Sequence, residues 1–236
     1  MMKMFIDYTQ ESVVLVMLYC SLINGGYSVF GQENFEALIQ PKIAINLNSD
    51  KLFSQNFSFS LRSFVYKNDW RYRGQHVQAS HFSTLAVSPY SKLSVGIMYR
   101  NLNLFDGNIV NEIRTTQQYN YAKRINSVRF GHRIRFEERI RRQRFAFRAR
   151  YRFAADFPLQ GQNLDTGEFY GLSNVEAVSS FQRNRTGQYE SRLTLGVGKV
   201  LKENIKTQIM LHYRLLDVFS SRENQLFFLL ETHIKI

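Results

Sequence analysis

Between Ser127 and Phe153 the chain alternates charged and apolar residues in the stretch SVRFGHRIRFEERIRRQRFAFRARYRF, which contains ten arginines. Successive side chains of a β-strand point to opposite faces, so this alternation predicts strands with one arginine-rich face and one apolar face. Apolar residues stand mostly at even positions before Arg142 and at odd positions after Gln143. A tight connection there would place every arginine on one face of a single antiparallel hairpin.

The same period of two recurs in both directions from this hairpin. It is found in the segments 57–65, 77–87, 93–99, 193–197, 205–215 and 226–236. Segments rich in turn residues separate them, and residues 36–47 form a candidate further strand in which Pro41 favours an edge or a lead-in position. Together these patterns predict roughly ten strands, with about twelve as the alternative.

Long alternating strands have exposed edges that a stable protein must close or cover. Two closed arrangements satisfy this requirement. A soluble, secreted, lipocalin-like barrel keeps its apolar residues inside, whereas an outer-membrane barrel exposes them to lipid and has a polar interior. Many of the segments are long enough for the roughly 9 to 11 tilted residues that cross a bilayer. We therefore predict an all-β fold, a single closed antiparallel transmembrane β-barrel, and keep the soluble barrel as the alternative.

The N-terminal region has the features of a secretory signal peptide. Lys3 precedes the apolar run VVLVMLYCSLI, which is too short for a membrane-spanning helix. We expect residues 1–31 to be the signal peptide and residues 32–236 to be the barrel. The chain's one cysteine, Cys20, lies in this run, so the exported barrel would have no disulfide bond.

The formal net charge is +12, and the location of the charges decides what this means. In a membrane barrel the arginines face the lumen, where they bind anions as arginine rings do in anion-selective pores, or pair with glutamates and fill the interior. The predicted lumen arginines are Arg129, Arg133, Arg135, Arg139, Arg148, Arg150, Arg152, Arg192 and Arg214. The predicted carboxylate partners are Glu137, Glu176, Glu190 and Glu231.

Other chemistries have weaker support in the sequence. Export separates the chain from nucleic acid, the five histidines lack the spacing of metal ligands, and we expect no cofactor. His81 and Ser83 are the one candidate catalytic pair, because a His-x-Ser pair on a strand supplies the base and the nucleophile of some outer-membrane lipid hydrolases. The strand expected beside this pair offers no carboxylate or amide to orient the histidine.

Four stretches of the C-terminal half carry a family resemblance. They are HRIRFEERIRR, RFAFRARYRFAADFPLQ, FYGLSNVEAV and RLTLGVGKVLKENIKTQIMLHYR, and an alternating strand follows to the last residue. The chain resembles the outer-membrane barrel family catalogued as domain of unknown function 2490, which we associate with Gram-negative bacteria of the Bacteroidetes type. The resemblance implies a barrel in the outer membrane and implies no established activity.

The sequence thus favours a non-enzymatic outer-membrane barrel that serves as a small channel or as an accessory scaffold. Its expected partners are outer-membrane lipid and lipopolysaccharide, the barrel assembly machinery and an anionic small solute, and a monomer is favoured. The two alternatives are a lipid hydrolase at His81 and Ser83 and the soluble lipocalin-like barrel.

Overall fold

The computed structural model describes residues 35–48, 52–103, 109–142, 144–183, 186–217 and 223–236. Their secondary structure consists of β-strands joined by turns. The strands are β1 (Phe35–Asn48), β2 (Phe53–Lys67), β3 (Asp69–Ala86), β4 (Ser91–Leu102), β5 (Val110–Ile125), β6 (Val128–Arg141), β7 (Arg144–Pro158), β8 (Phe169–Gln182), β9 (Gln188–Lys202), β10 (Ile205–Leu216) and β11 (Glu223–Lys235). No helix in these described ranges is long and apolar enough to span a membrane. The expected signal peptide, residues 1–31, lies outside the described residues.

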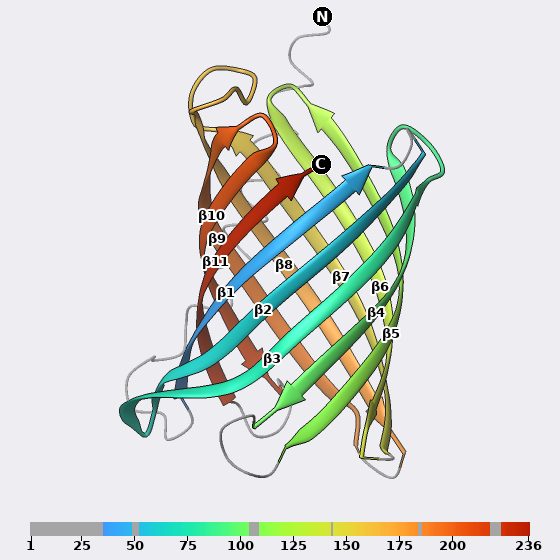
Figure 1. Ribbon diagram of the computed structural model, residues 1–236, viewed down its shortest axis with the longest axis vertical. Coiled ribbons are helices and arrows are strands. Elements are labelled where there is room, and N and C mark those ends of the chain that lie inside the picture. The colour runs from blue at the N-terminus through green and yellow to red at the C-terminus, as the bar shows by residue number, and fades with distance from the viewer. Residues whose placement is uncertain (1–34, 49–51, 104–108, 143, 184–185, 218–222) are drawn as a thin grey trace, which may run out of the picture. The chain divides into compact units, whose positions relative to one another are not determined.

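The strands form one closed barrel in which each strand pairs with its neighbours in the sequence, and β1 pairs with β11 (Figure 1). The predicted count of about ten strands was close, whereas the prediction of a purely antiparallel sheet was wrong. The described residues form eleven strands, and β1 runs parallel to β11. The parallel pair follows from the odd number of strands, because in an up-and-down barrel an odd number makes the first and last strands point the same way.

Pro41 lies within this parallel seam, opposite Leu230 of β11. The prediction of an edge position for it was therefore wrong, since β1 has a paired neighbour on both sides. Pro41 itself has no partner in the register between β1 and β2, which passes from Ile39 to Lys42. A missing backbone N–H is tolerated where the ladder is interrupted.

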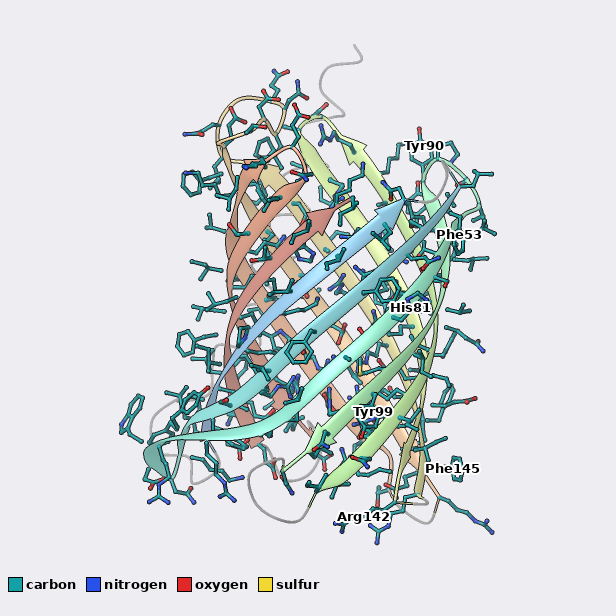
Figure 2. The ribbon with its side chains drawn as sticks, viewed as in Figure 1. Phe53, His81, Tyr90, Tyr99, Arg142 and Phe145 are labelled. Carbon is teal, nitrogen blue, oxygen red and sulfur yellow. The ribbon has the colours of Figure 1, made fainter. Side chains whose placement is uncertain are left out.

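The arginine-rich hairpin is confirmed as β6 and β7, which pair in continuous register from Arg129 opposite Asp156 to Arg141 opposite Arg144. Its apolar residues lie on the outer surface, where Phe145 is 68% exposed. Figure 2 shows Phe53, Tyr90, Tyr99 and Phe145 at the outer surface. The side chains on the opposite face of each strand point into the barrel.

The interior is mostly polar, which inverts the pattern of a soluble protein. Buried side chains include the charged residues Arg100, Glu112, Arg114, Glu137 and Arg192, while leucine, isoleucine, valine and phenylalanine are exposed on every part of the barrel surface. A lipocalin-like barrel needs its apolar face inside. The soluble alternative does not fit this arrangement.

Glycines inside the barrel make room for large side chains on neighbouring strands. The ring of Tyr170 on β8 covers Gly198 on β9, and a Cβ atom added to Gly198 would lie 2.6 Å from Tyr170 Cε1. Tyr170 also belongs to the one buried apolar cluster described, which it forms with Leu172, Val200 and Met210. Side chains thus fill this sector of the lumen.

Candidate anion-binding lumen

Glu112 on β5 is the centre of an ion-pair network in the lumen. Its side chain is 1% exposed, and its carboxylate lies 2.5 Å from Arg114, 2.9 Å from Arg139, 2.5 Å from Arg141 and 3.7 Å from Arg100. Hydrogen-bonded guanidinium groups offset the cost of removing this carboxylate from water. The network therefore ties β4, β5 and β6 together from inside.

A second buried carboxylate, Glu137 on β6, continues the network toward the middle of the barrel. Arg150 Nη2 donates a hydrogen bond to Glu137 Oε2 at 2.8 Å, and Arg135 Nη1 lies 3.6 Å from Oε1. Arg114 Nη1 is 3.8 Å from Glu137 Oε2 while its Nη2 contacts Glu112. Arg114 therefore links the two carboxylates.

Glu176 on β8 and Glu190 on β9 complete the network. Arg192 bridges them, with Nη1 at 2.7 Å from Glu176 and Nη2 at 2.5 Å from Glu190. Arg148 adds a contact of 3.0 Å to Glu190, and Arg150 lies 3.7 Å from Glu176. In the described part of the chain, four glutamates are thus held by eight arginines in one connected cluster inside the barrel.

The structure places all nine predicted lumen arginines on the inward face of their strands. Arg139, Arg135, Arg148, Arg150 and Arg192 belong to the network. The other four have different neighbours: Arg129 pairs with Asp156, Arg133 bonds Asn120, Arg214 lies over the Phe227 ring, and Arg152 lines the cavity described below. Contact of these arginines with an anion stays a prediction.

Three of the four predicted carboxylate partners, Glu137, Glu176 and Glu190, pair with arginine. Glu231 does not, because Lys42 Nζ and His233 Nε2 each lie 3.1 Å from its Oε2 atom. Glu112, the most heavily paired carboxylate, was not predicted as a lumen residue, and neither were three of its partners, Arg100, Arg114 and Arg141. All four lie on inward positions of β4, β5 and β6.

The lumen also contains a cavity of about 560 Å³, and some residues of the network belong to its lining. Its lining includes seven cationic side chains, Lys42, Arg129, Arg133, Arg135, Arg150, Arg152 and Arg192, against three carboxylates, Asp156, Glu176 and Glu231. Arg129, the second residue of β6, is 61% exposed at the barrel end. The cavity thus reaches the end of the barrel where β1 and β11 finish, and the ion-pair network lies beneath it.

Strand register explains where this cavity forms. Ala122, Gly131 and Ala154 are directly opposite one another on β5, β6 and β7, and all three line the cavity. Small side chains in one row leave space that longer ones would fill. The next row toward the network contains Arg133 and Arg152, which are opposite each other across β6 and β7.

His81 and Ser83 lie together on the outer face of β3, as Figure 2 shows for His81. His81 Nε2 and Ser83 Oγ are 3.1 Å apart, within hydrogen-bond distance. The His81 ring is 4.5 Å from that of Phe57, and its buried Nδ1 has no hydrogen-bond partner among the residues described. Within the described ranges, His81 and Ser83 thus lie together without a third group that would orient the histidine.

The other histidines have neighbours of different kinds. His132 lies on the outer face, where its Nδ1 is 2.8 Å from the hydroxyl of Tyr151. Inside the barrel, His212 Nδ1 lies 2.8 Å from Thr194 Oγ1. Over the described ranges, no group of three or more His, Cys, Asp or Glu residues could hold a metal ion.

Comparisons with known proteins identify the family. No curated protein matches the chain. Among solved structures it is similar to the siderophore receptor PirA from Pseudomonas aeruginosa, with 12% sequence identity, a TM-score of 0.30 and coverage of 75% of this chain and 34% of the receptor. The chain thus spans about a third of that receptor's length. The family model described as "Protein of unknown function (DUF2490)" matches residues 42–225, more than half of the chain, and the chain therefore belongs to this family.

Proposed function

We propose that this protein is a non-enzymatic outer-membrane β-barrel of a Gram-negative bacterium, whose lumen is a basic cup that binds anionic small solutes. The cup is the cavity of about 560 Å³, and the Glu112 to Glu190 ion-pair network is its floor. The observation that carries the proposal is the excess of cationic side chains over carboxylates in the cavity lining.

The exposed apolar surface supports the membrane location. Residues such as Val95, Ile97, Leu195 and Leu211 are about half exposed on the outside of the barrel. Soluble monomers rarely expose an apolar surface of this extent, whereas transmembrane barrels need an outward apolar band. Tyr90 and Tyr99 lie toward opposite ends of the barrel (Figure 2), as aromatic girdles require.

The floor favours binding over conduction. Glu112 and Glu137 are each 1% exposed and lie within contact distance of several arginines. Because charged groups with this many partners are costly to separate, the network would block passage of a solute through the lumen. The barrel would then hold an anion at one end without passing it through.

Conductance in planar bilayers tests this part of the proposal. The wild-type barrel should show no steady ion current, and the triple variant R114A/E137A/R150A, which removes the centre of the floor, should conduct. Anions should carry most of that current because the remaining lumen is basic. A steady current through the wild-type barrel would overturn the closed-floor proposal. Folding of the triple variant is checked by the shift in gel mobility between unboiled and boiled samples. If the triple variant shows no such shift, the single variant R114A is tested instead.

A second candidate function is lipid hydrolysis at His81 and Ser83. The 3.1 Å contact between them favours it, and so does an outer groove of about 550 Å³ that Ser83 lines together with Leu85, Leu93 and Phe136. An acyl chain could occupy this groove while Ser83 attacks the ester carbonyl and His81 accepts its proton.

Fatty-acid release from phospholipid in mixed micelles tests the second candidate. Hydrolysis by the wild type that is lost in S83A would establish it. The control is S80A, because Ser80 lies on the inward face of the same strand and bonds Ser58. If the wild-type protein releases no fatty acid, the hydrolase candidate is eliminated and the non-enzymatic proposal stands.

A further inference from the structure

Arg133 and Arg152 form a pair of neighbouring cations in the cup. They are directly opposite each other across β6 and β7, and both line the cavity. Directly opposite residues on adjacent antiparallel strands have Cβ atoms roughly 5 Å apart on the same face. Two guanidinium groups at this separation can bind the same functional group of a ligand.

Neither arginine has a carboxylate partner in the described part of the chain. Arg133 donates from Nε to Asn120 Oδ1 at 2.8 Å, which is a neutral acceptor. The carboxylate beside Arg152 in the register, Glu176, is held by Arg192 at 2.7 Å and by Arg150 at 3.7 Å. Among the described residues, neither Arg133 nor Arg152 therefore forms an ion pair, although Glu176 lies opposite Arg152 in the register.

The adjacent row of the same hairpin also contains two opposed arginines, but these two share a carboxylate. Arg135 and Arg150 are also opposite each other across β6 and β7. Glu137 contacts both, at 3.6 Å and 2.8 Å. Like-charged residues in directly opposed positions are unfavourable unless a negative group lies between them. In the row of Arg133 and Arg152 the carboxylate is Glu176, which lies opposite Arg152 and pairs with Arg192 and Arg150. Within the described barrel, no carboxylate therefore contacts both Arg133 and Arg152 as Glu137 contacts Arg135 and Arg150.

Space for a ligand lies next to this pair. Ala122, Gly131 and Ala154 form the neighbouring row, and a Cβ atom added to Gly131 would meet nothing closer than the Tyr121 carbonyl oxygen at 3.9 Å. The cavity volume of about 560 Å³ is within the range of small-molecule sites. A ligand whose anionic group contacts the two arginines therefore has space for an uncharged part over the small residues.

We infer that Arg133 and Arg152 together bind the phosphate group of a small phosphate monoester, whose uncharged part lies over Ala122, Gly131 and Ala154. This inference rests on the proposed function and names its ligand class. A phosphate monoester carries nearly two negative charges and three acceptor oxygens, which match two guanidinium forks. A carboxylate carries one charge and two oxygens, so one arginine satisfies it.

Isothermal titration calorimetry of the full chain in detergent tests the inference with three probes, glucose 6-phosphate, glucuronate and glucose. We expect glucose 6-phosphate to bind more tightly than glucuronate, and glucose not to bind. The variants R133Q and R152Q should each weaken glucose 6-phosphate binding by about tenfold or more, because each removes charge-assisted hydrogen bonds. R133K keeps the charge and loses the fork, so its loss should be intermediate.

Two further variants separate contact from general electrostatics. R144Q removes one positive charge at the far end of β7 and should leave binding unchanged. G131L fills the space beside the arginines without changing any charge, and it should abolish binding of glucose 6-phosphate. Each variant must retain the heat-modifiable gel shift of a folded barrel, and G131L tests the site independently if R133Q does not fold.

The possible results distinguish the inference from the proposed function. Equal affinity for glucose 6-phosphate and glucuronate, unchanged in R133Q and R152Q, would overturn the phosphate site while leaving an anion-binding cup. If neither anion binds to the wild-type barrel, both the cup and the phosphate site are wrong. Tight phosphate-monoester binding that is lost in R133Q, R152Q and G131L, and retained in R144Q, supports both.

Discussion

Glu137 and Glu138 are consecutive in the chain and lie on opposite faces of β6. The Glu137 carboxylate is buried and accepts a hydrogen bond from Arg150 at 2.8 Å. The Glu138 carboxylate is exposed on the outer face and accepts a hydrogen bond from Thr115 Oγ1 at 3.1 Å. One strand therefore offers two identical side chains in opposite environments, which makes a matched comparison.

Replacement of Glu137 by glutamine should destabilise the barrel strongly. E137Q keeps the shape of the side chain but removes the negative charge that Arg150 and Arg135 share. Breaking a buried ion pair from one side costs about 3 to 5 kcal/mol. Urea unfolding in lipid vesicles measures the loss. E138Q is the control and should change the free energy of unfolding by less than about 1 kcal/mol. Equal effects of the two variants would show that the network does not stabilise the lumen.

Arginine on the outer surface should cost most at the middle of a strand. Leu195, near the centre of β9, is 53% exposed. If lipid covers it, L195R should destabilise the folded barrel in vesicles by about 2 to 4 kcal/mol. The same substitution at Leu201, next to the end of β9, should cost only about 0 to 1 kcal/mol. No difference between L195R and L201R would contradict a membrane-spanning orientation of the barrel.

A methyl group at Gly198 should displace the ring of Tyr170. The added Cβ would lie 2.6 Å from Tyr170 Cε1, so G198A should destabilise the barrel by about 1 to 3 kcal/mol. Removing the ring in Y170A should relieve this clash, and the double variant should be more stable than the sum of the single effects predicts. The control is G131A, whose methyl group has free space. Simple additivity of G198A and Y170A would disprove the contact.

A disulfide across the parallel seam tests the eleven-strand closure. Ile39 of β1 is opposite Phe228 of β11. With Cys20 replaced by serine, the variant I39C/F228C should form an intramolecular disulfide upon oxidation, detected by mass spectrometry of a tryptic digest. The pair I39C/Y99C, on strands that do not neighbour each other, should stay reduced. Failure of the first pair to cross-link would show that β1 and β11 do not meet in this register.

The sequence was informative wherever alternation was uninterrupted. In β6 and β7 every second residue is apolar over most of the hairpin, so its register, its turn and the inward direction of its arginines could be predicted. In β5 the outward positions include Thr115 and Gln117. These polar residues interrupt the apolar face and hide the period, and the prediction therefore missed β5 and with it Glu112.

Closure and pairing could not be predicted from local pattern. Whether ten, eleven or twelve strands close a barrel depends on how the first and last strands meet, and this contact joins residues that are far apart in the sequence. Likewise, Glu231 occupies an inward position like that of Glu176, yet it pairs with Lys42 because β1 is its neighbour across the seam. A pattern within one strand predicts which face of the sheet a side chain lies on. It does not predict which strand lies beside it.

The parallel seam also places Phe35 and Ile236 at opposite ends of the barrel, because β1 and β11 run in the same direction (Figure 1). The cup reaches the end at which Ile236 lies. In a barrel that spans a membrane, an epitope attached after Ile236 therefore faces the compartment from which the proposed cup would take its ligand. Protease or antibody accessibility of that epitope on intact cells would distinguish a receptor for external solutes from one that collects solutes of the periplasm.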